Sequence, residues 1–90
     1  AKLYEKAGRY DEATSEYLGM MQDKRSNLGY LYYQIAGIYS VQEKQEESLL
    51  ALKKSRQHGF DILQNIRGDE RFKKFRSTEY YKKLLKEEKT

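Results

Sequence analysis

The sequence of 90 residues has no cysteine, no proline and no tryptophan, and it has one histidine, His58. Without cysteine there is no disulfide and no thiol catalysis. A single histidine leaves too few groups for a zinc site or a Ser-His-Asp triad. No phosphate-binding loop, metal motif or nucleophile elbow is present either. We therefore expect a protein that is not an enzyme and carries no cofactor or metal, in a compartment that the sequence leaves open.

Long hydrophobic runs are also missing. No stretch approaches the ~18 apolar residues that a membrane span needs, and residues 1–6 lack the apolar core of a signal peptide. Hydrophobic residues make up 38% of the chain and charged residues 36%. A chain of this length buries only about 60% of the surface that its unfolded form exposes. These limits predict one small domain with no membrane span.

Tyrosine is abundant, with nine residues against three phenylalanines, and the apolar spacing is helical. The clearest i, i+3, i+4, i+7 series is Leu28, Leu31, Tyr32, Ile35, Ile38 and Tyr39. The pattern predicts helices at 1–7, 10–22, 27–41, 44–57 and 61–67, with short helices near 70–75 and 79–88. The candidate N-terminal caps are Asn27, Asp61, Asp69 and the pair Ser77-Thr78. No segment has the alternation of a strand, so the predicted class is all-α.

The chain also repeats itself at an offset of 35 residues. This offset pairs Ala1 with Ala36, Tyr4 with Tyr39, Ala13 with Ser48 and Tyr17 with Leu52. The two best-defined motifs are Tyr32-x2-Ile35-Ala36-x2-Tyr39, followed by Ser48-x3-Leu52, and the earlier run Gly8-Arg9-Tyr10-Asp11-Glu12-Ala13. Small residues at the paired positions would let two antiparallel helices approach closely, and Gly8 would supply a turn with positive φ.

These motifs resemble the tetratricopeptide repeat, a helix-turn-helix unit of ~34 residues. The resemblance divides the chain into a truncated first repeat at 1–25, a second repeat at 26–59 and closing helices at 60–90. The last segment, from His58-Gly59-Phe60 to Leu84, resembles the helices that close many bacterial arrays of this family. The implied fold is a fragment of a right-handed solenoid of antiparallel helix-turn-helix repeats with capping helices.

The family implies a module that binds a protein or peptide in a concave groove lined by the first helix of each repeat. On a helical wheel of 27–41, the face opposite the expected core is the candidate groove. The predicted groove residues are Tyr30, Tyr33, Gln34, Gly37, Ser40 and Val41, joined by Lys2 and Lys6. On this interpretation Tyr4, Tyr17, Tyr32 and Tyr39 pack the core. The alternative is that the same face packs against the closing helices.

Two further interpretations stay open. Because such arrays usually need about three repeats for stability, the truncated repeat predicts further repeats upstream of Ala1 or self-association. The module could instead be a structural appendage that docks within its own chain beside an upstream enzyme or transporter domain. The carboxylate clamp known in this family is not matched, because Tyr33 and Gly37 stand where lysine and asparagine are expected.

Positive charge is concentrated in the C-terminal part of the chain. Residues 1–52 carry six basic and eight acidic residues, whereas residues 53–90 carry 12 basic and six acidic residues. Nucleic-acid binding would require aromatic side chains exposed beside these bases. The spacing instead assigns the aromatic residues to burial, namely Phe72, Phe75, Tyr80 and Tyr81 together with Leu84 and Leu85. A solvated, mixed-charge helix surface is therefore favoured over a nucleic-acid interface.

Overall fold

The computed structural model describes residues 8–89, and the side chains of residues 8–87. All regular structure in this range is helical, which confirms the predicted all-α class. The elements are α2 (Tyr10–Met20), α3 (Leu28–Val41), α4 (Gln45–Gln57), α5 (Ile62–Gly68), η1 (Glu70–Phe72), η2 (Phe75–Ser77) and α6 (Glu79–Lys89). The expected short helix near 70–75 is replaced by two single 3-10 turns. The expected helix at 1–7 lies outside the described residues.

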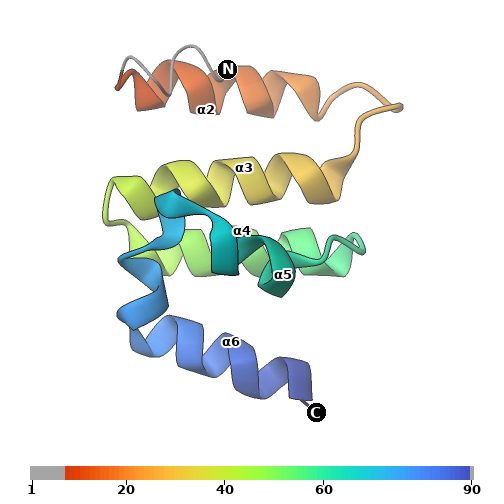
Figure 1. Ribbon diagram of the computed structural model, residues 1–90. Helices are drawn as coiled ribbons and strands as arrows, with labels where there is room; N and C mark the ends of the chain where they lie inside the picture. The colour runs from red at the N-terminus through yellow and green to blue at the C-terminus, as the bar shows by residue number, and fades with distance from the viewer. Residues whose placement is uncertain (1–7, 90) are drawn as a thin grey trace.

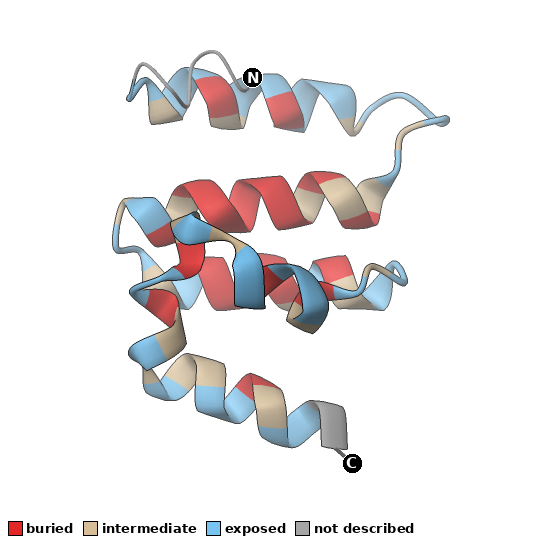
Figure 2. Cartoon of the chain, in the orientation of Figure 1, coloured by how far each residue is buried: buried red, intermediate tan, exposed pale blue. Residues whose placement is uncertain are grey.

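Three antiparallel helices form the body of the molecule, with α3 in the centre (Figure 1). The helices α2 and α4 flank α3 and run in the same direction as each other, opposite to α3. After α4 the chain turns back through α5 and η1 across α3, and α6 then lies along α4. Figure 2 shows that α3 is buried along most of its length, whereas α2 and α6 are largely exposed. No helix within the described range is long and apolar enough to cross a bilayer.

The backbone itself repeats at the predicted offset. Gly8 and Glu43 both take positive φ, at 76° and 63°. Arg9 and Lys44 follow with nearly the same conformation, φ −94° and −89° with ψ 71° in each case. The helices α2 and α4 then begin one residue later, at positions 35 residues apart. The left-handed turn predicted at Gly8 is confirmed. The second turn uses Glu43, for which the left-handed backbone conformation is unfavourable in free energy.

Small residues allow α3 and α4 to approach closely, as predicted. The Ser48 hydroxyl donates a hydrogen bond to the Ala36 carbonyl at 2.8 Å. Seven residues later in α4, Ser55 donates to the carbonyl of Gly29, seven residues earlier in the antiparallel α3, at 2.6 Å. Ala13, Ala36 and Ser48 are each fully buried. These two serine contacts satisfy hydroxyl groups that burial would otherwise leave unpaired.

Side-chain caps fix the starts of the middle helices. The Asn27 and Asp61 side chains accept hydrogen bonds from backbone N–H groups three residues on, at 3.1 and 3.3 Å, and Asp69 does the same two residues on, at 3.0 Å. These predicted caps are confirmed. Ser77 and Thr78 behave differently, because their hydroxyls donate backwards to carbonyls three residues earlier, at 2.8 and 2.7 Å. Both hydroxyls therefore close η2, directly before α6 begins.

Candidate functional site

The face of α3 predicted as a partner groove is covered by the chain's own closing segment. The Tyr33 hydroxyl donates a hydrogen bond to Asp69 Oδ2 at 2.8 Å. The Gln34 side-chain oxygen accepts a hydrogen bond from Arg71 Nη1 at 2.9 Å. Tyr33 and Gln34 are only 3% and 6% exposed. The structure thus corrects the expectation that this face is open at these positions, because η1 returns over α3 after α5.

Gly37 is explained by the same contact. A Cβ atom at this position would lie 2.6 Å from Arg71 Cζ and 2.8 Å from Nε and Nη1. The guanidinium is held there by Asp69, which accepts from Nε at 3.2 Å and from Nη2 at 2.8 Å. It also lies 5.8 Å from the centre of the Tyr33 ring. The helix therefore has a glycine here to admit an arginine of the chain itself, not a ligand.

Electrostatics stabilise this internal contact. Burial raises the pKa of Asp69, but hydrogen bonds from Arg71 and Tyr33 more than offset it and leave the pKa below its usual range. Burial and the neighbouring Asp69 carboxylate together raise the pKa of Tyr33 well above its usual range. At neutral pH the cluster therefore holds a carboxylate, a guanidinium and a neutral phenol, a combination in which each polar group finds a partner.

Of the remaining predicted groove residues, Ser40 and Val41 line one hollow of about 270 Å³ together with side chains from Glu70 to Lys74. Tyr30 is half-buried, and its ring meets that of Phe60 edge-on at 6.4 Å between centroids. Ser40 is buried beside η1, whereas Val41 is 38% exposed at the end of α3. Lys2 and Lys6 lie outside the described residues. The structure thus brings Tyr33, Gln34, Gly37 and Ser40 together, but beneath its own η1 segment.

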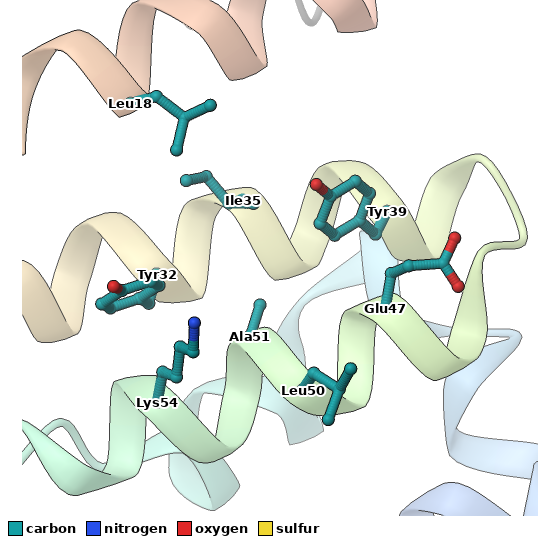
Figure 3. Close-up of a pocket in the computed structure, with 8 residues that line it drawn as sticks. All are labelled: Leu18, Tyr32, Ile35, Tyr39, Glu47, Leu50, Ala51 and Lys54. Carbon is teal, nitrogen blue, oxygen red and sulfur yellow. The ribbon is translucent and has the colours of Figure 1, made fainter.

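A second surface, on the opposite side of α3, is open. A hollow of about 260 Å³ lies between α2, α3 and α4, and Figure 3 shows the side chains around it. We call this hollow the α2–α4 groove; it is lined by Leu18, Tyr32, Ile35, Tyr39, Glu47, Leu50, Ala51 and Lys54. Leu18 and Leu50, one from each flanking helix, are 50% and 55% exposed. Exposed apolar side chains that converge on a hollow are typical of docking surfaces.

The two ends of the α2–α4 groove carry opposite charges. Lys54 lies at one end, with its Nζ 5.6 Å from the centre of the Tyr32 ring. The His58 ring stacks on the same tyrosine at 5.7 Å. Glu47 lies at the other end, beside Tyr39 (Figure 3). The groove is therefore an apolar trough with a basic end and an acidic end.

Several basic residues of the C-terminal part pair with acidic groups of the chain. Lys74 pairs with Glu43 at 2.7 Å, and Lys82 pairs with Glu79 at 3.2 Å. Glu87 accepts from both Lys53 and Arg56, at 3.3 and 3.2 Å. The large aromatic residues Phe72 and Phe75 are fully buried, as the sequence predicts. The surface thus has the mixed-charge character expected of it, with its phenylalanines inside.

Within residues 8–89, no group of three or more histidine or acidic side chains is close enough to hold a metal ion. Comparisons of the chain with protein-family models, with curated proteins and with solved structures found no match. The site is therefore assigned from geometry. One face of α3 is covered by η1 at Tyr33, Gln34 and Gly37, with a hollow beside Ser40 and Val41 at its end. The other face presents exposed leucines around the α2–α4 groove. The second face has the composition of a protein-docking surface.

The sequence contained a signal for the α2–α4 groove that periodicity alone does not reveal. Leu18 follows the buried Tyr17, and Leu50 follows the buried Leu49, so each leucine lies outside the buried stripe of its own helix. Large apolar residues outside that stripe are informative when several of them meet. Their meeting depends on α2 and α4 flanking α3 with these leucines on the same side of the layer, which only the fold establishes.

Proposed function

We propose that this chain is a non-catalytic helical-repeat module of the tetratricopeptide type that binds a protein partner through the α2–α4 groove. The single observation that carries the proposal is the convergence of the half-exposed Leu18 and Leu50 on one hollow between the helices. The site differs from the groove expected from the family resemblance, because it lies on the other side of α3.

The repeat character is supported by the backbone. The same backbone sequence occurs twice, 35 residues apart, starting at Gly8 and at Glu43. In each case a residue with positive φ is followed by a residue with nearly the same φ and ψ, and a helix then begins. Stacked helix pairs of this length are the units of solenoid proteins, and their faces commonly serve as binding surfaces.

The binding role is supported by the free energy that a partner would gain by covering the apolar side chains of the groove. Fully burying a leucine side chain is worth about 1.5–3 kcal/mol, so covering the exposed half of both leucines would contribute about that much in total. Tyr32 and Tyr39 add rigid aromatic surface of the kind enriched at protein interfaces. The groove thus offers a small central cluster able to anchor a complex.

Site-specific photo-crosslinking tests this proposal. A photoreactive phenylalanine analogue replaces Leu50 in one variant and the exposed Gln64 of α5 in a matched control, and both are expressed in the source cells. We expect a protein adduct at position 50 that is absent at position 64 and is lost when Leu18→Glu is added. Equal adducts at both positions, no adduct at position 50, or an adduct only with a second copy of this chain would contradict the proposal.

A further inference from the structure

The shape of the α2–α4 groove favours a helical occupant. Its walls are two helices that run in the same direction, and its floor is the outward face of α3 from Tyr32 to Tyr39 (Figures 1 and 3). These eight residues span about 10 Å, or two helical turns. Because the walls are helices, their backbone groups away from the helix ends are paired internally and are not offered to an extended strand. Apolar side chains spaced i, i+3, i+4 and i+7 on a helix fit such a trough.

The charges along the walls determine the direction of that helix. The acidic end of the groove is marked by Glu47, which lies in the first turn of α4. The opposite end carries Lys54 and His58. A helix favours acidic residues in its own first turn and basic residues in its last turn.

We infer that the occupant of the α2–α4 groove is an amphipathic helix that lies antiparallel to α2 and α4. This helix has acidic residues in its first turn and basic residues in its last turn. The inference rests on the proposed function. In this direction its acidic start meets Lys54 and its basic end meets Glu47. The reverse direction would place the same charges against like charges at both ends. The groove therefore selects both the charge pattern and the polarity of its partner.

Two designed probes test this inference on the 90-residue chain. Both are amphipathic helices of about 11 residues, in which the first and last turns lie about 10 Å apart, as Glu47 and Lys54 do on α4. They have identical composition and are stapled on the outward face so that their helix contents are equal. The acid-to-base probe carries glutamates in its first turn and lysines in its last turn, and the base-to-acid probe carries them reversed. We expect the acid-to-base probe to bind about three- to tenfold more tightly in fluorescence anisotropy at low salt. The Leu50→Glu variant should bind neither probe.

A charge-swapped protein provides the decisive comparison. The double variant Glu47→Lys with Lys54→Glu exchanges the two ends of the groove at constant net charge and should prefer the base-to-acid probe. The matched control, Glu79→Lys with Lys82→Glu, exchanges an exposed ion pair on α6 and should keep the native preference. A reversal of preference is a gain of binding to one probe, so it cannot result from unfolding.

The contrary outcomes are distinct. Equal affinity for both probes, unaltered by the swap, would overturn the inferred direction and leave the proposed function standing. If neither probe binds although position 50 crosslinks to a partner, the helical occupant is wrong and the docking surface is right. If the chain alone forms a dimer in sedimentation velocity that Leu50→Glu dissociates, the occupant is a second copy and the inferred partner is refuted.

Discussion

Replacing Gly37 with alanine should destabilise the protein, although the same change in an ordinary helix is stabilising. Alanine is favoured over glycine inside a helix by about 1 kcal/mol. Here, however, the new methyl group would lie 2.6–2.8 Å from three atoms of the Arg71 guanidinium, which must move. The movement would break the bond to Gln34, and a hydrogen bond to a charged group is worth about 1.5–3 kcal/mol. We expect a net loss of about 1 kcal/mol.

The sign of this effect should reverse when the arginine is absent. In an Arg71→Ala background no guanidinium opposes the methyl group, so Gly37→Ala should stabilise the protein by about 0.5–1 kcal/mol. The assay is urea unfolding followed by circular dichroism for all four proteins, in a fixed concentration of trimethylamine oxide that keeps each of them folded. The same effect of Gly37→Ala in both backgrounds would refute the claim that Arg71 occupies this face of α3.

Two further predictions concern the turn before α4 and the buried carboxylate. Glu43→Gly should be more stable than Glu43→Ala by about 1 kcal/mol, or about 4–8 °C in Tm. Both variants lose the ion pair with Lys74, but only glycine adopts the left-handed backbone without strain. Equal melting points of the two variants would contradict this. The lowered pKa of Asp69 means that its carboxylate stabilises the fold above about pH 4, its unfolded value, and loses this effect as the pH falls further. The difference in unfolding free energy between the native chain and Asp69→Asn should therefore narrow below about pH 4 in urea titrations, and a constant difference would contradict the assignment.

Much of the fold could be predicted because its determinants are local. The helix boundaries follow from apolar spacing and from caps such as Asn27 and Asp61, each of which bonds within its own first turn. The 35-residue repeat was visible in small and aromatic residues, and the backbone repeats with it at Gly8 and Glu43. Ser77 and Thr78 show the limit of such local signals, because their hydroxyls donate to the preceding turn, a contact that the cap pattern does not predict.

The proposed binding surface could not be predicted, because it depends on contacts between distant segments. Wheel analysis treats a helix as having one buried face, whereas α3 is packed on both. Asp69 and Arg71 lie more than 30 residues from Tyr33 in sequence, and nothing local indicates that they cover it. The tyrosines consequently exchange roles: Tyr33, expected at the groove, is buried, and Tyr32 and Tyr39, expected in the core, line the α2–α4 groove.

The measurement that tests the central claim most directly is an amide shift map of the 15N-labelled chain titrated with the acid-to-base helical probe. The account predicts that the largest perturbations fall on the α2–α4 groove, at Leu18, Ile35, Leu50 and Lys54. The amide chemical shifts of the residues beneath η1 should change little. Perturbations concentrated instead at Tyr33, Gln34 and Gly37, with the groove unaffected, would contradict the account and restore the opposite face of α3 as the binding surface.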